Sequence, residues 1–334
     1  MLNRFPLLSL TAREIVFRLY CRHEQGPRSN VLLYCSRRGG STWLLNTLAA
    51  HPGVRYVGRS FDALLSSRWA RLVPPLGPSP STEERKRRIY AGFDDADLDR
   101  FRPIAESVIS GKRNIYPSLN FRAQYFERRT ERVVFQVTNA TALIEWFDGE
   151  FDAHTVLLLR HPIPTALSIL KQGWEPEDWE FVTHGDYATR HLTSAQLDLA
   201  QRIVAGGSIL ERHVLDWTLK MLVPVRGFES GQHPDWVVIT YEQMVLEPVQ
   251  ILKFLSKALD FPQLDPMLEQ VRRPSRTVTA ETADRVEDPT YLLDRWRRQI
   301  SETQERELMS IPEAFGLDMY PVGCRTASDR YLLD

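Results

Sequence analysis

Residues 30–52, NVLLYCSRRGGSTWLLNTLAAHP, contain the residue types of an anion-binding loop. Four apolar residues run into two arginines, two glycines and two hydroxyl side chains, and an apolar helical pattern follows at once. A strand, a glycine-rich turn and a helix that starts with Ser and Thr offer exposed N–H groups, the positive end of a helix dipole and hydroxyl donors. The common phosphate loop G-x-x-x-x-G-K-S/T is absent, because no lysine precedes Ser41.

A second anion signal lies at residues 155–173, TVLLLRHPIPTALSILKQG. Arg160 ends a predicted buried strand, and Ser168 follows eight residues later on a predicted helix. A guanidinium binds a phosphate through two parallel hydrogen bonds, and a hydroxyl on the next helix can add a third. A lone arginine at a strand end is more often a salt-bridge partner. Two anion sites on adjacent parallel strands, however, suit a nucleotide that is phosphorylated at two positions.

These segments resemble a known family. SRRGGSTWL resembles the 5′-phosphosulfate loop of the sulfotransferases, and RHPIPTALS resembles their 3′-phosphate motif, in the same order along the chain. Residues 236–262 are similar to the family's strand, Tyr-Glu turn and helix. The segments RRPSRTVTAE and DRWRRQIS resemble the C-terminal part of the bacterial and Golgi carbohydrate-type members, rather than the cytosolic aryl type. The resemblance covers about residues 30–320.

The resemblance implies a binding site for 3′-phosphoadenosine-5′-phosphosulfate (PAPS), the sulfuryl donor of this family. Arg38 stands at the position of the family's loop Lys or Arg, where a cation neutralises the charge that builds on the leaving oxygen. Trp43 is expected either near the adenine or in the core, and Arg276 either at the 3′-phosphate or on the surface. The implied cofactor-binding residues are Arg37, Arg38, Gly39, Gly40, Ser41, Thr42, Trp43, Arg160, Ser168 and Arg276.

The general base departs from the family pattern. Carbohydrate-type members carry a Glu shortly after the loop, but the segment here reads GRSFDALL and Arg59 takes that position. Asp62 is the candidate base, since a carboxylate near the transferred group can accept the hydroxyl proton. It can equally be a first-turn helix carboxylate. The histidine of cytosolic members has no counterpart in FQVTNA, and His51, His184 and His191 lie outside the motifs.

Short apolar runs, each followed by turn signals and a helical stretch, predict an α/β fold. The runs lie at 31–34, 54–57, 133–137, 155–159 and 236–240. Val- and Leu-rich strands without alternation are typical of a parallel sheet that helices cover on both faces. We therefore expect a P-loop-like parallel sheet with ligands at the carboxyl ends of the strands. Residues 94–130 and 193–227 are expected as helical insertions, 291–309 as a late amphipathic helix, and 73–88 as a loop or lid.

The expected organisation is one sulfotransferase domain at residues 30–320. Residues 1–29 form an N-terminal extension, and residues 321–334 form a C-terminal tail. Within the extension, residues 11–22 read as an amphipathic helix that packs on the domain or, as the minority alternative, contacts a membrane surface. No apolar run at the N-terminus is long enough to span a bilayer.

Composition narrows the class of protein. The 334 residues are 43% hydrophobic and 25% charged, as in ordinary globular proteins, and the formal net charge of −1 provides no global attraction for nucleic acid. The three cysteines, Cys21, Cys35 and Cys324, give neither a disulfide framework nor a zinc pattern, and Cys35 is expected in the core. We expect a reducing, cytoplasmic location. No metal is implied, because the protein donors can neutralise one sulfuryl charge.

The sequence thus predicts a PAPS-dependent sulfotransferase. The expected acceptor is a hydroxyl of a sugar, a glycolipid or a lipid-like natural product. One alternative is a non-catalytic protein that binds PAPS or its product, 3′-phosphoadenosine-5′-phosphate (PAP). A nucleotide-dependent phosphotransferase is a weaker alternative, because it needs a loop lysine and a metal-binding Asp at a strand end, and neither is visible.

Overall fold

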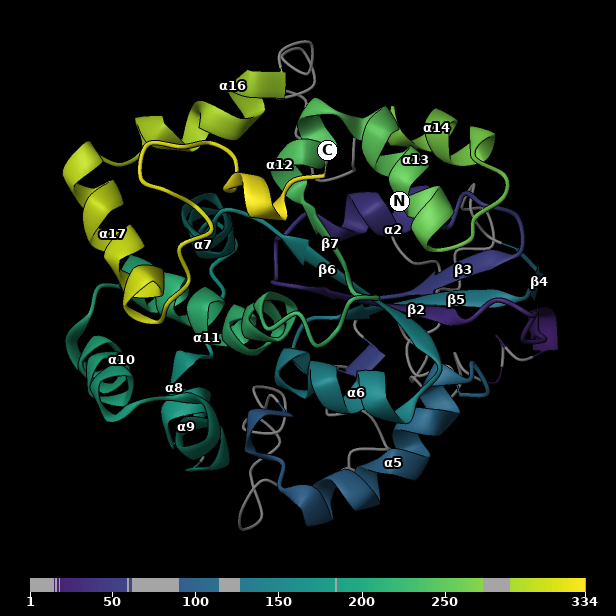
Figure 1. The fold of residues 1–334 in the computed structure, drawn as a ribbon, viewed down its shortest axis with the longest axis horizontal. Helices are drawn as coiled ribbons and strands as arrows, with labels where there is room; N and C mark the ends of the chain where they lie inside the picture. The colour runs from purple at the N-terminus through teal and green to yellow at the C-terminus, as the bar shows by residue number, and fades with distance from the viewer. Residues whose placement is uncertain are drawn as a thin grey trace.

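The computed structural model of the chain describes residues 15, 17, 19–58, 60–61, 90–113, 127–183, 185–272 and 289–333. Its centre is a five-stranded parallel sheet with the strand order β3-β5-β2-β6-β7 (Figure 1). The strands are β2 (Asn30–Cys35), β3 (Val54–Val57), β5 (Arg132–Val137), β6 (Ala153–Leu159) and β7 (Val237–Thr240). All five apolar runs form strands, so the predicted α/β fold with a parallel sheet flanked by helices is confirmed.

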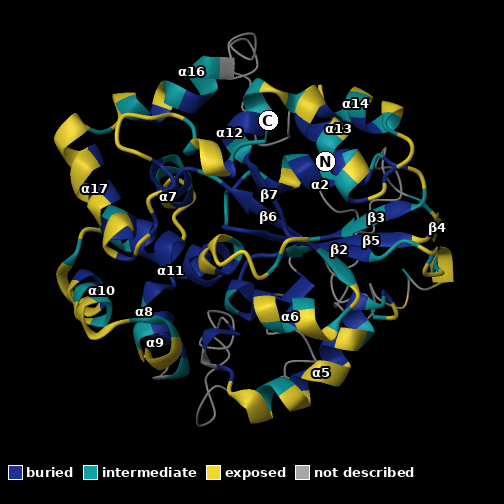
Figure 2. Cartoon of the chain, viewed as in Figure 1, coloured by how far each residue is buried: buried dark blue, intermediate teal, exposed yellow. Residues whose placement is uncertain are grey.

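Alternate residues of each strand enter two separate cores. Leu32 and Tyr34 of β2 pack in one core, whereas Val31, Leu33 and Cys35 pack in the other. Because both faces are covered, every residue of β2 is buried, which explains the missing polar alternation. Figure 2 shows the buried strands between two helical layers, with exposed residues on the outer sides of α5, α10 and α17.

Four helices among the described residues supply apolar residues to the core that holds Leu33: α2 (Ser41–Leu48), α12 (Tyr241–Leu246), α13 (Pro248–Ala258) and α14 (Asp265–Val271). The core on the opposite face receives residues from more elements. They include α5 (Asp95–Ile109), η3 (Thr141–Leu143), α6 (Ile144–Glu150), α7 (Pro162–Leu170), α10 (Ser194–Gly206), α11 (Ile209–Glu229) and α17 (Glu302–Ala314). α11 is buried along most of its length and packs against α7, so it forms the inner wall beside the ends of β2 and β6.

Shorter elements complete the fold. They are η2 (Tyr90–Gly92), α8 (Asp178–Thr183), α9 (Gly185–His191), α12 (Tyr241–Leu246), α16 (Pro289–Asp294), η4 (Arg295–Arg298) and η5 (Asp329–Tyr331). β1 (Arg22–His23) and β4 (Arg129–Thr130) pair in parallel as a second, two-stranded sheet.

Two predicted helical segments are divided by capping residues. The expectation of one helix over 291–309 is wrong, because α17 starts as a new helix after Ser301. Ser301 Oγ accepts a hydrogen bond from the Gln304 N–H, and the Ser301 N–H donates to the side-chain oxygen of Gln304. The same arrangement of Ser208 and Glu211 separates α10 from α11 within 193–227. In 94–130 only α5 is helical among the described residues, and β4 ends the segment. The predicted loop at 73–88 lies outside the described residues.

Three of the described apolar residues in the N-terminal extension are exposed to solvent. Ile15, Leu19 and Tyr20 are helical but 55%, 76% and 56% exposed, so the expected packing of this side on the domain is wrong at these positions. Phe17 is half-buried, and the Arg55 guanidinium lies 5.3 Å from the centroid of its ring. No helix among the described residues is long and apolar enough to cross a membrane. Cys35 is fully buried in the core, as predicted.

Candidate functional site

The loop between β2 and α2 makes a tight turn that two glycines permit. Gly39 donates its N–H to the Ser36 carbonyl at 3.1 Å, and a Cβ on Gly39 would lie 2.9 Å from that oxygen. Gly40 has a φ of 92°, and a Cβ there would lie 2.3 Å from Cδ2 of Tyr241. Arg38 also has a positive φ, 62°, which is uncommon for a residue with a side chain. The loop is therefore held in a specific, costly conformation.

The start of α2 points its free N–H groups at this turn. Gly40 is the N-cap and provides no side-chain cap, and the first turn has no acidic residue. The Trp43 N–H bonds to the Gly40 carbonyl at 3.1 Å, but no side chain caps the N–H groups before it. Because the helix dipole is also positive there, this helix start favours an anion. Ser41 is buried and its Oγ accepts a hydrogen bond of 2.7 Å from Gln136, whereas Thr42 is exposed.

Trp43 fits the core interpretation better than the adenine one. Its indole N–H donates to the Val271 carbonyl at 3.2 Å, and its ring makes an edge contact with Tyr241 at a centroid distance of 6.3 Å. The half-buried side chain packs against the core that contains α2, α13 and α14.

The two predicted anion signals meet at the carboxyl ends of the central strands, the carboxyl edge of the sheet. Arg38 Nε donates to Ser168 Oγ at 2.9 Å, and Arg160 Nη1 donates to the Arg38 carbonyl at 2.6 Å. Arg160 directly follows β6, and Ser168 lies on α7, as the sequence predicted. The parallel pairing of β2 with β6 brings together residues that are more than 100 positions apart in the chain.

Two cations lie side by side at this edge. Neither Arg38 nor Arg160 forms an ion pair with an acidic side chain among the described residues, and Arg160 Nε has no hydrogen-bond partner there. The Arg160 guanidinium instead lies 4.1 Å from the centroid of the Tyr241 ring. Burial, followed by the charge of Arg160, lowers the pKa of Arg38. The charge distribution and the free N–H groups at this edge both favour a polyanion.

The sequence prediction did not recognise what holds the Arg160 turn. Glu242, fully buried, accepts hydrogen bonds from the His161 N–H at 3.0 Å and from the Tyr320 hydroxyl at 2.9 Å. Burial raises the pKa of Glu242, although these hydrogen bonds oppose the rise. Tyr241, its neighbour, packs against both Gly40 and Arg160. The Tyr-Glu pair directly after β7 was the available signal in the sequence.

Arg37 lies apart from this group, although the resemblance placed it in the cofactor site. Its guanidinium donates to the Glu175 carbonyl at 3.1 Å and lies 3.4 Å from Glu177 and 3.6 Å from Asp216. Burial would raise the pKa of Asp216, but the charges of Lys220 and then Arg37 outweigh it and hold that pKa below its usual value. Arg37 thus belongs to an ion-pair network with Glu177 and with Asp216 of α11.

Of the other residues that the sequence singled out, four lie outside the described residues. Asp62, the candidate base, and Arg276, the additional phosphate contact, lie outside the described residues, as do Arg59 and His184. His191 ends α9, with its ring 5.0 Å from that of Tyr187.

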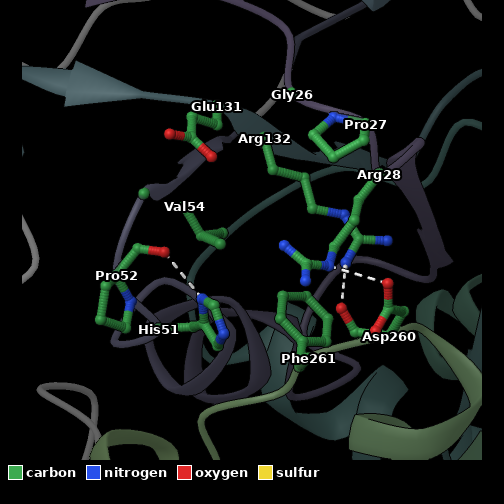
Figure 3. A pocket seen from close by; sticks show the side chains of 11 residues that line it. Gly26, Pro27, Arg28, His51, Pro52, Val54, Glu131, Arg132, Asp260 and Phe261 are labelled. Atoms are coloured by element: carbon green, nitrogen blue, oxygen red, sulfur yellow. Dashed lines mark hydrogen bonds and ion pairs between the residues drawn. The ribbon is translucent and has the colours of Figure 1, made fainter.

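A small cavity lies at the opposite edge of the sheet, the amino edge, where the strands begin (Figure 3). Its volume is about 20 Å³, enough for about one water molecule, so a nucleotide cannot enter it. Arg132 and Arg28 lie together there beside Phe261, and Arg28 forms an ion pair with Asp260 at 2.8 Å. Among the described residues, the carboxyl edge is therefore the better place for an anionic ligand.

Comparisons with known proteins give no family assignment. No protein-family model matches the chain, and no curated protein matches it. Among solved structures, the sulfotransferase domain of the Synechococcus PCC 7002 olefin synthase is similar at a TM-score of 0.43 and 17% identity, over 88% of this chain and 98% of that domain. The sulfotransferase domain of the curacin biosynthetic pathway is similar at a TM-score of 0.44 and 17% identity, over 88% of this chain and 99% of that domain. Sulfotransferase STF9 from Mycobacterium avium is similar at a TM-score of 0.38 and 12% identity, over 82% of this chain and 76% of that protein. The function of this chain has to be inferred from its own residues.

Proposed function

We propose that the chain is a PAPS-dependent O-sulfotransferase that transfers a sulfuryl group to a hydroxyl of a sugar, a glycolipid or a lipid-like natural product. The observation that supports this most strongly is the meeting of the two anion motifs through Arg38, Arg160 and Ser168, with neither arginine in an ion pair among the described residues. A ligand with anionic groups at two positions suits such a paired site.

The residues present fit the donor. Arg160 has a buried, unpartnered Nε, and α2 begins with N–H groups that no side chain caps. In this proposal Arg160 and Ser168 bind the 3′-phosphate, while the N–H groups of the loop and of Ser41 and Thr42 bind the 5′-phosphosulfate. PAPS, when bound, supplies an activated sulfuryl group.

Arg38 has the role of stabilising the leaving group. As the bond between the sulfur and the bridging oxygen breaks, negative charge collects on that oxygen, and a fixed guanidinium stabilises it. The left-handed backbone at Arg38 and the hydrogen bond to Ser168 keep the cation in place before the reaction starts. The acceptor oxygen forms the new bond to sulfur, its proton passes to a general base, and PAP leaves.

Asp62 is our candidate for that base. It is the carboxylate nearest in sequence to the family's Glu position, which Arg59 occupies here. Replacing Asp62 with Asn preserves size and removes basicity, so turnover should fall about 10²–10⁴-fold with nucleotide affinity unchanged. A fall of less than about threefold would move the role to His184 or His191.

A transfer assay separates this proposal from its alternatives. We expect labelled sulfate to pass from PAPS to members of a panel of sugars and lipids, with PAP formed in equal amount. A protein that binds PAP tightly but transfers nothing to the panel would favour the non-catalytic alternative, for which the Arg at position 59 gives some support. Transfer of phosphate from ATP would favour the phosphotransferase.

A further inference from the structure

A surface cavity of about 680 Å³ reaches the anion-binding loop through Arg37. The segment between α7 and α8 forms one wall, and α11 forms another. The residues that matter for its chemistry are Arg37, Trp174, Glu175, Glu177, Trp179 and Arg212. Its volume is in the range of small-molecule binding pockets.

The cavity starts where the proposed donor site ends. Arg37 and Arg38 are consecutive, but Arg38 bonds to Ser168 on α7, whereas Arg37 bonds to the Glu175 carbonyl at the cavity. A molecule in the cavity therefore lies next to the loop that would hold the sulfuryl group.

An exposed aromatic ring lines the cavity. Trp174 is 44% exposed, which is unusual for so large an apolar side chain, and its ring centroid lies 5.9 Å from the Arg37 guanidinium. Trp179, partly buried, is a second aromatic residue of the lining. Such a flat apolar face can stack on a ring of similar shape.

The charges of the lining are fixed by buried partners. Arg212 binds the fully buried Asp178 at 2.8 and 3.0 Å, through two of its nitrogens. Glu177 accepts a hydrogen bond of 2.6 Å from the buried Lys220 on α11. The lining therefore presents charged groups at set positions. Counted with its buried partners, the cluster has no excess of positive charge, because Asp178 pairs with Arg212 and Asp216 pairs with Arg37 and Lys220.

This combination distinguishes between the possible acceptors. An alkyl chain would cover the guanidinium and carboxylate groups and replace their water without any hydrogen bonds, which is unfavourable. A sugar ring has an apolar C–H face for Trp174, and hydroxyls at its rim that donate to carboxylates and accept from guanidinium groups. Because the cluster has no excess of positive charge, it favours an uncharged sugar over an acidic one.

We propose that this cavity is the acceptor site and that it takes the ring of a neutral sugar, with Trp174 as the stacking surface. The proposal rests on the sulfotransferase function proposed above, and it selects a sugar ring over an alkyl chain as the part of the acceptor that enters the cavity. Trp174 then determines specificity and has no part in the transfer itself.

Saturation-transfer NMR tests this on the full chain with PAP added. The probes are the methyl glycosides of glucose, galactose and N-acetylglucosamine, with 1-hexanol as the alkyl comparison. We expect at least one glycoside to bind more tightly than hexanol, with saturation strongest on its ring C–H protons. Trp174→Ala should weaken that binding roughly tenfold, and Trp174→Phe should restore most of it. Val322→Ala is the control, because Val322 is 46% exposed and does not line the cavity.

Calorimetry with PAP alone separates the two proposals. If PAP binds but no glycoside does, or if Trp174→Ala leaves glycoside binding unchanged, the sugar site is overturned and the sulfotransferase proposal stands. Tighter binding of hexanol than of every glycoside would also overturn the sugar site and leave the sulfotransferase proposal standing. If a glycoside binds at Trp174 but PAP does not bind, the sulfotransferase function is overturned and with it the role of the sugar as acceptor. If neither ligand binds, both proposals are wrong.

Discussion

Arginines gather at both edges of the sheet, but their surroundings differ. At the amino edge, Arg132 donates to the carbonyls of Ser29 and Leu259 at 2.6 Å each, and Arg28 pairs with the carboxylate of Asp260 (Figure 3). At the carboxyl edge, Arg38 and Arg160 lie together without an ion-pair partner among the described residues.

The difference indicates two uses of the same side chain. Arg132 is 3% exposed and joins the start of β5 to two other segments, so its contacts stabilise the fold. Arg38 and Arg160 carry like charges at short range, which costs free energy in the absence of an anion. In our proposal a bound polyanion offsets that cost, so that the carboxyl edge serves binding and the amino edge serves stability.

Replacing one arginine at each edge should separate these roles most clearly. Arg160→Ala should weaken binding of the 3′-phosphorylated nucleotide by about 2–5 kcal/mol, because a charge-assisted contact to the 3′-phosphate is lost. Binding of adenosine-5′-phosphosulfate, which lacks that phosphate, should hardly change. Calorimetric titration with both ligands measures this. Equal losses for the two ligands would show that Arg160 does not recognise the 3′-phosphate.

Arg132→Ala is the matched control at the amino edge. It should lower the free energy of unfolding in urea while the folded protein keeps its nucleotide affinity, because its carbonyl contacts lie at the other end of the strands. A large loss of affinity in this variant would remove the distinction between the edges.

The next largest effect should come from the loop cation. Arg38→Ala should lower turnover at saturating donor about 10²–10³-fold, since the guanidinium acts mainly when charge moves to the leaving oxygen. Nucleotide affinity should fall less. Arg28→Ala, which removes an exposed ion pair at the amino edge, should change neither quantity appreciably. Collapse of affinity with normal turnover at saturation would make Arg38 a ground-state binder only.

Two glycines with positive φ extend the comparison to the backbone. Gly40→Ala and Gly53→Ala should each cost about 1–2 kcal/mol in the free energy of unfolding, because both positions are left-handed. At Gly53 the nearest atom to a new Cβ is 3.9 Å away, whereas at Gly40 the Tyr241 ring is in the way at 2.3 Å. Gly40→Ala should therefore cost roughly 1–3 kcal/mol more and also weaken PAP binding. Equal effects of the two variants would contradict the role of Tyr241 at the loop.

The sequence predicted those features that depend on local pattern. Five apolar runs became five strands, and the order of the two anion motifs placed Arg38, Arg160 and Ser168 at one edge, because parallel strands put their carboxyl ends together. The spacing of apolar residues was less informative where a capping residue interrupts a helical segment. The late helical segment looked continuous by its apolar spacing, but Ser301 and Gln304 form a cap that starts a new helix.

Side-chain direction was the main feature that the sequence could not predict. Arg37 and Arg38 are adjacent and identical in type, yet one binds the network of Glu177 and Asp216 and the other binds Ser168. The positive φ of Arg38 turns the backbone between the two side chains. This conformation is uncommon for a residue other than glycine, so the sequence did not predict it. The contacts of Tyr241 were missed for a related reason, since they join elements far apart in the chain.

The smallest predicted effect concerns one histidine at each edge. Burial, reinforced by the charges of Arg297 and Arg160, lowers the pKa of His161 to about 3. The folded protein therefore stays unprotonated at His161 well below pH 6.5, whereas the unfolded chain takes up a proton there near pH 6.5. Because the unfolded state binds more protons between pH 6.5 and about 3, this group makes the free energy of unfolding fall as the pH falls through that window.

His161→Asn removes this titration and preserves the helix cap, since an Asn oxygen can replace the Nδ1 that accepts from the Ile163 N–H. The loss of ring contacts with Trp296 and Tyr320 lowers stability by an amount that does not vary with pH. The slope of stability against pH should therefore become shallower by up to about 1.4 kcal/mol per pH unit, measured by urea unfolding between pH 6.5 and 4. His51→Asn at the amino edge should change the slope less. Burial also lowers the pKa of His51, but its hydrogen bond to the Pro52 carbonyl favours the protonated ring and opposes that shift. Equal slope changes for the two variants would show that the pKa of His161 is not lowered more than that of His51.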